Sequence, residues 1–167
     1  MNEKKLFSLV LVSVMAALSL GLYALESLIP SIVPVPGVKL GLSNVITLIC
    51  IYIIGRKSAF AVLLIRIFLS SLLFGQPVSL LFSLFGGILS FAVMAILKSF
   101  FDKSNIWTIS VFGAFAHNFG QIIAAVLITN ELSVAYYFLF LIISSVLTGI
   151  FTGISAQMAI KKLEKII

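Results

Sequence analysis

Residues 78–97 read VSLLFSLFGGILSFAVMAIL, a run of 20 positions without a charged side chain. A helix needs roughly 20 apolar residues to cross the hydrocarbon core of a bilayer, so this run predicts a membrane-spanning helix. The whole chain shares this character, because 62% of its 167 residues are hydrophobic and 10% are charged. Soluble domains carry roughly 25% charged residues. The composition therefore excludes a water-soluble fold and predicts an all-α integral membrane protein that forms one domain over residues 1–167.

Charges and prolines divide the chain into six apolar stretches, and we expect each stretch to be a membrane-spanning helix. They are Leu6–Leu25, Leu40–Gly55, Ser58–Phe74, Val78–Leu97, Ile106–Thr129 and Val134–Ile160. The second and third are shorter than the others, so we expect each of them to be tilted, thinned at its ends or partly re-entrant. A cleaved signal peptide is disfavoured for the first stretch, because the apolar region of a signal is typically about 7–15 residues long.

The basic residues predict the orientation of the six helices. If the chain starts in the cytoplasm, nine of the eleven basic residues lie in cytoplasmic segments, Lys39 lies outside, and Arg66 lies within the third helix. This distribution follows the positive-inside rule at every loop. Both termini are therefore expected in the cytoplasm of a bacterial-type cell, in its cytoplasmic membrane. The topology accounts for the net charge of +6, which leaves no reason to expect nucleic acid as a partner.

Small residues recur every fourth position in three of the predicted helices. The rows are Ser13, Ala17 and Gly21; Ala116, Gly120 and Ala124; and Ser145, Gly149 and Gly153. Small residues let membrane helices approach closely. Each row is predicted either to pack inside the bundle or to bind a partner subunit.

Arg66 is the most informative single residue, because an arginine near the middle of a membrane costs at least about 2.5–3.5 kcal/mol on insertion scales. It must therefore face a polar group. One interpretation is that Arg66 binds an anion or a carbonyl group of a substrate. The other is structural: the guanidinium caps backbone carbonyls or forms an ion pair with Glu26.

The fifth predicted helix contains GAFAHNFGQ at residues 113–121. His117, Asn118 and Gln121 lie on adjoining parts of one helix face. Three hydrogen-bonding side chains are more than the joining of two helices requires, so we predict that they bind substrate. A proton carrier and a satisfied core histidine are the alternatives for His117. The chain has one His and one Cys, so neither a metal site nor a cofactor is expected.

The first external loop, PSIVPVPGVKLGLSN at residues 30–44, holds three of the four prolines and remains largely apolar. Prolines restrict its backbone, while Gly37 and Gly41 allow close approach to a neighbour. The loop is predicted either to cover the external end of the bundle, with Lys39 and Asn44 pointing inward, or to be a rigid connector whose lysine meets lipid phosphate.

Five stretches along the chain carry a resemblance to a known family. They are Glu26–Pro30, Pro36–Asn44, Arg66 with Ser71–Gly75, the pair Gly86 and Gly87, and Gly113–Gln121. Their order and spacing resemble the Gx transporter family, which is also labelled heptaprenyl diphosphate synthase component I. The resemblance spans essentially the whole chain.

The transporter label implies similarity to the S components of energy-coupling factor importers. These are six-helix membrane proteins that capture a vitamin-like molecule from outside, while a membrane coupling subunit and ATPases supply the energy. This chain has no Walker A motif, in keeping with a binding subunit that is not an enzyme. The resemblance also implies that the first helix docks the coupling subunit through small residues, here Ser13, Ala17 and Gly21.

The synthase label implies elongation of a prenyl diphosphate for the menaquinone side chain. That chemistry holds magnesium ions with clustered aspartates. This chain has one aspartate, Asp102, so it cannot be the catalytic subunit. It is instead a non-catalytic membrane partner of a soluble prenyl synthase, or a transporter of an isoprenoid or quinone-related molecule. The substrate-binding residues expected for a transporter are Lys39, Asn44, Arg66, His117, Asn118 and Gln121.

Overall fold

The computed structural model describes residues 3–28, 39–74 and 77–165, which fold into helices without any strand. The six α-helices are α1 (Glu3–Ser27), α2 (Asn44–Ile53), α3 (Arg56–Phe74), α4 (Pro77–Leu97), α5 (Ile106–Thr129) and α6 (Phe138–Leu163). The short 3-10 helices η1 (Lys103–Asn105) and η2 (Leu132–Tyr137) precede α5 and α6. The prediction of an all-α protein with six helices is confirmed.

Five of these helices, all except α2, are long and apolar enough to cross a membrane. The ten residues of α2 extend about 15 Å at about 1.5 Å per residue, half of the roughly 30 Å hydrocarbon core. Glycines in the left-handed region bound this helix, Gly41 (φ +80°) before it and Gly55 (φ +86°) after it. The predicted second span, Leu40–Gly55, is therefore a short helix between two glycine turns.

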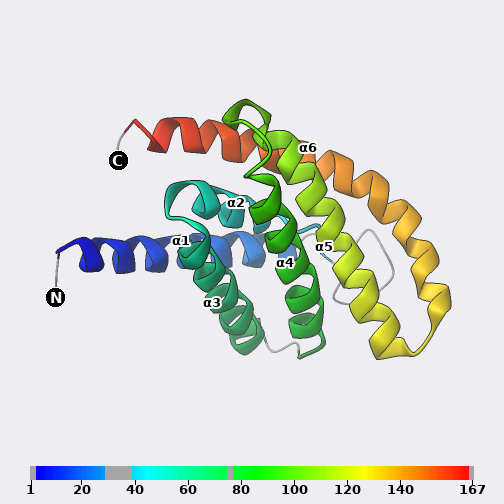
Figure 1. Cartoon of the computed structure of the whole chain (residues 1–167). Coiled ribbons are helices and arrows are strands. Elements are labelled where there is room, and N and C mark those ends of the chain that lie inside the picture. Colours follow the sequence, from blue (N-terminus) through cyan, green and yellow to red (C-terminus); the bar gives the residue numbers. More distant parts are fainter. Residues whose placement is uncertain (1–2, 29–38, 75–76, 166–167) are drawn as a thin grey trace.

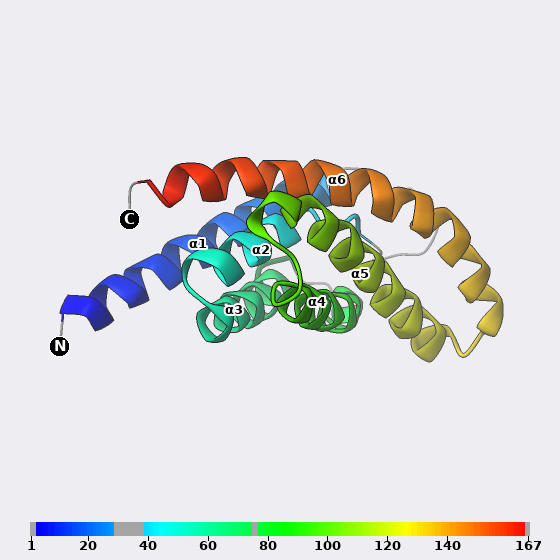
Figure 2. The same cartoon turned by 45° about the horizontal axis from the view of Figure 1, so that its top comes forward.

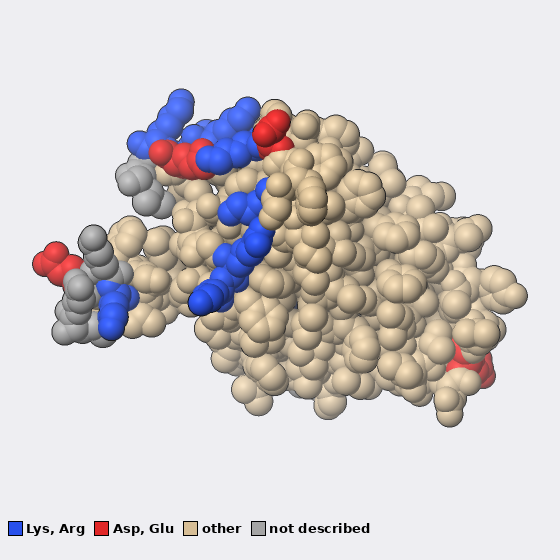
Figure 3. All heavy atoms as spheres, in the orientation of Figure 1, with Lys and Arg blue, Asp and Glu red and all other residues tan. Residues whose placement is uncertain are grey.

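The two ends of the bundle differ in charge. The helix α1 begins and α6 ends at the same end of the molecule, and the turns α2–α3 and α4–α5 lie there too (Figure 1). Lysine and arginine side chains gather on this end, and the opposite part of the visible face has none (Figure 3). The start of α1 and the end of α6 thus lie at the basic end of the bundle. That both termini are cytoplasmic stays a prediction.

The short helix α2 forms the centre of the bundle. It contacts each of the other long helices, and Leu48, Cys50 and Ile51 are fully buried. Figure 2 shows α2 lying between α6 and the pair formed by α3 and α4. At its C-terminal end, the Lys98 ammonium donates a 2.6 Å hydrogen bond to the Ile51 carbonyl. Partial burial, with the nearby cations Arg56 and Lys103, lowers the pKa of Lys98.

Glycines set the close crossings of α5 with its neighbours. A Cβ on Gly120 would lie 2.5 Å from the carbonyl oxygen of Phe85 in α4, and one on Gly149 would lie 2.5 Å from the Cα of Val111 in α5. The rows at Ala116–Ala124 and Ser145–Gly153 thus pack inside the bundle. The first row differs, because Ser13, Ala17 and Gly21 are exposed.

The outer surface of the bundle is apolar. The residues Leu139, Phe140, Ile143, Leu147 and Phe151 of α6 are each at least 65% exposed. Monomeric soluble proteins rarely expose a contiguous apolar surface of this kind, whereas lipid stabilises one. Together with the five long apolar helices, this surface identifies a multi-pass membrane protein.

Candidate functional site

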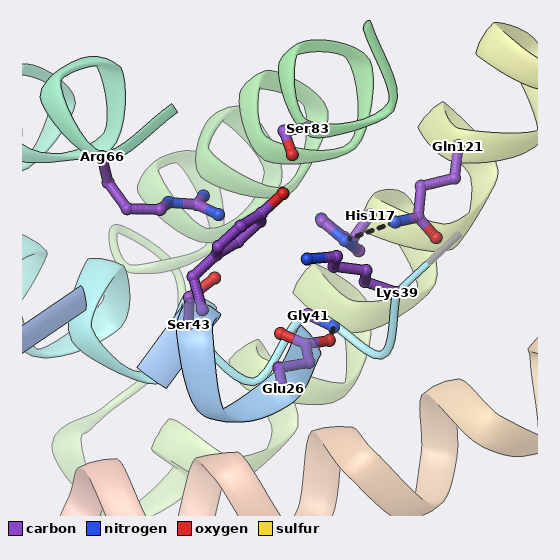
Figure 4. Close-up of a pocket in the computed structure, with 9 residues that line it drawn as sticks. Glu26, Lys39, Gly41, Ser43, Arg66, Ser83, His117 and Gln121 are labelled. Atoms are coloured by element: carbon purple, nitrogen blue, oxygen red, sulfur yellow. Dashed lines mark hydrogen bonds between the residues drawn. The ribbon is translucent and has the colours of Figure 1, made fainter. Parts of the chain in front are cut away.

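A small polar pocket lies between the end of α1, the segment before α2, and the helices α3, α4 and α5 (Figure 4). Its lining residues are Tyr23, Glu26, Lys39, Gly41, Ser43, Arg66, Ser83, His117 and Gln121. Four of the six residues predicted to bind substrate, Lys39, Arg66, His117 and Gln121, therefore meet in one place. The pocket lies near the end of α1 that is remote from the two termini.

Arg66 reaches the pocket from α3 with its side chain almost completely buried, at 1% exposure. Its Nε and Nη2 atoms have no hydrogen-bond acceptor among the described residues. Gly87 on α4 leaves space beside the guanidinium, since a Cβ there would lie 3.5 Å from Nη2. A buried cation without an acceptor is costly unless an anion supplies one. The guanidinium is thus a ready donor for an anionic ligand.

Tyr23 contacts both cations of the pocket. The Lys39 Nζ lies 3.4 Å from the centre of its ring, and the Arg66 Cζ lies 5.9 Å from it. The Tyr23 hydroxyl forms a 2.7 Å hydrogen bond with Ser79 of α4, which holds the ring in place. Cation–π contacts of this kind stabilise a positive charge where water is scarce. Our sequence reasoning did not select Tyr23, although its spacing of three residues from Glu26 places both on one face of α1.

Glu26 lines the same pocket from the last turn of α1, but it does not form the ion pair with Arg66 that the structural interpretation allows. Within the described ranges, the ion pair with nitrogen and oxygen within 4.0 Å is Lys103–Glu164. Glu26 instead accepts the backbone N–H groups of Gly41 (2.5 Å) and Leu42 (3.1 Å). Both carboxylate oxygens are thereby used, and they hold the segment before α2 against α1.

His117 and Gln121 come from successive turns of α5 and contact each other through a 3.1 Å hydrogen bond between the Gln121 Nε2 and the His117 Nε2 (Figure 4). Two glycines make room for the imidazole. A Cβ on Gly86 would lie 2.9 Å from Nδ1, and a Cβ on Gly41 would lie 2.9 Å from Cδ2. The Gln121 Oε1 is buried without a partner among the described residues, so this amide has hydrogen-bonding capacity left for a ligand.

The structure does not bring Asn118 and Asn44 into the pocket lining. The Asn118 Nδ2 donates to the Leu141 carbonyl (3.0 Å) and to the Ser145 Oγ (2.8 Å), so this amide joins α5 to α6. Asn44 is 8% exposed and lies behind Gly41, whose Cβ would stand 2.9 Å from the Asn44 Nδ2. It supports the turn that carries Gly41.

Most of the predicted external cover, residues 29–38, lies outside the described residues. Its last part is described, from Lys39 to Asn44, and it lines one side of the pocket through Lys39, Gly41 and Ser43. The first N–H groups of α2 are already used, because Asn44 and Val45 donate to the carbonyls of Gly41 and Leu42. Anion binding at this side therefore depends on side chains.

The enclosed cavity measures about 10 Å³, which is room for about one water molecule. An organic head group therefore requires the walls of the pocket to move. Within residues 3–28, 39–74 and 77–165, no group of three or more His, Cys, Asp or Glu side chains is placed to hold a metal ion. The lining combines two cationic side chains, Arg66 and Lys39, with one carboxylate, Glu26.

The family model for heptaprenyl diphosphate synthase component I matches residues 15–159 of the chain. Neither the comparison with curated proteins nor the comparison with solved structures finds a match. The matched range includes every residue of the pocket lining. It also covers most of the helices α2–α6 and the second half of α1. The chain therefore belongs to the heptaprenyl diphosphate synthase component I family.

Proposed function

We propose that this protein is a membrane-embedded binding subunit that captures a small anionic organic molecule from outside the cell for uptake. The observation that carries the proposal is the Arg66 guanidinium, which is 1% exposed and has two nitrogen atoms without an acceptor among the described residues. Insertion scales assign such a residue a cost of about 2.5–3.5 kcal/mol. A ligand that neutralises the charge explains why a costly arginine is present at this position.

The position of the pocket supports capture from outside. With the basic end of the bundle in the cytoplasm, the pocket near Glu26 and Lys39 belongs to the external half of the protein. Lys39, His117 and Gln121 supply further polar contacts there. We place the protein in the cytoplasmic membrane of a bacterial-type cell.

An uptake protein of this design needs partners, because a binding pocket alone does not drive transport. We propose a membrane coupling subunit and ATPases as those partners, with Ser13, Ala17 and Gly21 as the docking row. These residues are exposed on α1, and a Cβ at Gly21 would meet nothing within 4 Å. The row is thus exposed on the surface of the described bundle.

The direct test is native mass spectrometry of the gently purified protein and of Arg66→Met. We expect the wild type to retain a small organic anion and Arg66→Met to lose it. Methionine keeps the length of the side chain and removes the buried charge, so the variant should remain folded, and its melting temperature in detergent checks this. Retention of the same anion by Arg66→Met would contradict the proposal.

A second function is favoured by the family description. It is that of a non-catalytic membrane subunit that acts with a soluble prenyl diphosphate synthase. The single aspartate of the chain, Asp102, leaves the catalytic magnesium site to that partner. The test is co-expression with the soluble synthase, followed by co-purification and measurement of prenyl chain length with and without this subunit. Co-purification of the synthase with an empty membrane subunit would favour this function over uptake.

A further inference from the structure

The residues that line the pocket indicate the class of its ligand more narrowly than anions in general. We propose that the head group bound at Arg66 is a singly charged carboxylate, in preference to a phosphate or diphosphate. This inference rests on the proposed binding function and specifies its ligand class. The charge balance of the pocket favours the single charge, and the free donors of the pocket can hold the head group.

The charge balance favours a monoanion. The charged side chains that line the pocket are Arg66, Lys39 and Glu26. Both oxygens of Glu26 accept backbone N–H groups, an arrangement that suits the ionised, acceptor-only carboxylate. The three groups together carry one net positive charge, which a monoanion neutralises. A dianion would leave one uncompensated negative charge in a site where Arg66 and Glu26 are 1% and 4% exposed, and burial makes such a charge costly.

The free donors can hold a carboxylate head group. The Nε and Nη2 atoms of Arg66 lack acceptors among the described residues, and two guanidinium N–H groups bind the two oxygens of a carboxylate in parallel. The buried Ser43 hydroxyl, at 1% exposure, lines the same pocket and is also without a partner there. Lys39 already contacts the Tyr23 ring, so Arg66 and Ser43 are the primary donors and Lys39 adds a further contact.

The test compares two ligands with the same four-carbon tail, butyrate and butyl phosphate. Equilibrium dialysis of the purified full chain in a neutral detergent measures binding of radiolabelled butyrate and its displacement by each unlabelled compound. The measurement is made at about pH 8 and about pH 5.5, on either side of the second phosphate pKa of about 6. Butyl phosphate is a dianion at the higher pH and mainly a monoanion at the lower one.

At about pH 8 we expect butyl phosphate to compete at least about tenfold more weakly than butyrate, because of its second charge. At about pH 5.5 the difference between the two compounds in how strongly they compete should be smaller; this difference is called the gap below. Glu26→Gln adds one net positive charge to the pocket, so this variant should also narrow the gap at about pH 8. Ser19→Ala is the matched control: Ser19 is a buried α1 serine, its hydroxyl is unpartnered among the described residues, and it does not line the pocket. It should leave the gap unchanged.

Two results would overturn the inference, and they differ in what they say about the proposed function. If butyl phosphate competes better than butyrate at about pH 8 and Arg66→Met abolishes binding of both, the carboxylate assignment is wrong and the anion-binding function stands. If neither compound binds in a manner that depends on Arg66, with Arg66→Met still folded by size-exclusion chromatography, both proposals fail.

Discussion

Glu26 at the end of α1 accepts a 2.5 Å hydrogen bond from the backbone N–H of Gly41 and thereby fixes the turn that leads into α2. A second bond, 3.1 Å long, comes from the N–H of Leu42. The carboxylate thus connects two segments of the pocket wall that are fifteen residues apart in the sequence. Its removal should loosen the wall as well as change the charge of the pocket.

Glu26→Ala is expected to lower the free energy of unfolding by about 2 kcal/mol, since hydrogen bonds to charged groups contribute about 1.5–3 kcal/mol each and part of the loss is recovered by water. Denaturant titration in detergent measures the change. Glu131→Ala, at an exposed position, should be within about 0.5 kcal/mol of the wild type. Equal effects of the two substitutions would show that the Glu26 bonds do not stabilise the fold.

Gly41 and Gly55 form a matched pair for testing the packing around His117. Both have positive φ, +80° and +86°, so alanine at either position costs about 1–2 kcal/mol in backbone strain. A Cβ at Gly41 also meets the His117 Cδ2 at 2.9 Å, whereas one at Gly55 meets nothing within 4 Å. Gly41→Ala should therefore destabilise the protein by about 1–3 kcal/mol more than Gly55→Ala. Thermal unfolding of the two variants provides the comparison, and equal melting temperatures would contradict it.

Gly120→Ala should force α4 and α5 apart. The added methyl group would lie 2.5 Å from the backbone oxygen of Phe85, and a backbone atom cannot move aside alone. We expect a loss of about 1–3 kcal/mol or more, as for other overpacked sites. Gly21→Ala is the control, because Gly21 is helical and its surroundings are open; alanine should stabilise α1 there by up to about 1 kcal/mol. The experiment is a stability measurement of both variants in one detergent.

Substitutions at Asn118 and Gln121 should affect different properties, the stability of the fold at Asn118 and the affinity for the ligand at Gln121. Asn118→Ala removes two hydrogen bonds to α6, and measured values for such bonds in membranes predict a loss of about 0.6–1.7 kcal/mol. Because Asn118 does not line the pocket, affinity for the ligand should not change. Gln121→Ala should weaken the ligand at least about threefold, an estimate for one lost hydrogen bond. The dialysis assay and thermal unfolding, applied to both variants, distinguish the two roles, and a similar loss of affinity in both would refute the separation.

The orientation of the bundle can be tested with fusions. A reporter that is fluorescent only in the cytoplasm should be active when attached after Lys165 and inactive when inserted at Asn130, in the exposed turn between α5 and η2. A periplasmic phosphatase at the same two sites should give the opposite pattern. The reverse result at both sites would place the pocket in the cytoplasmic half and would contradict capture from outside.

The long helices could be predicted because the length of an uncharged run is a property of the sequence alone. The second predicted span, Leu40–Gly55, is longer than the helix α2 for a physical reason. Apolar residues are needed for burial in protein as well as for contact with lipid, and seven of the ten residues of α2 are buried in the bundle. Hydropathy does not separate these two environments. The glycines at positions 41 and 55 mark the true ends, but their positive φ is known only from the structure.

The pocket was partly predictable for a related reason. Arg66, His117 and Gln121 stand out because polar side chains are rare in membrane helices. Asn118 has the same chemistry as Gln121, but neighbouring positions on a helix point in different directions, and here the neighbour at Asn118 is α6. Tyr23 carries no such signal, since aromatic residues near the end of a membrane helix are usually interfacial. Its position beside Lys39 and Arg66 is known only from the structure.

The shortness of α2 also bears on how the chain enters the bilayer during synthesis. A ten-residue helix is too short to be held across a membrane by itself, and the next helix, α3, contains Arg66. Only Ile54 and Gly55 separate the two helices, so we expect α2 and α3 to enter the bilayer together as one helical hairpin. Because residues of α4 and α5 line the pocket beside Arg66, we expect the guanidinium to become buried only after those helices have been made. On this view the protein completes its fold late in synthesis.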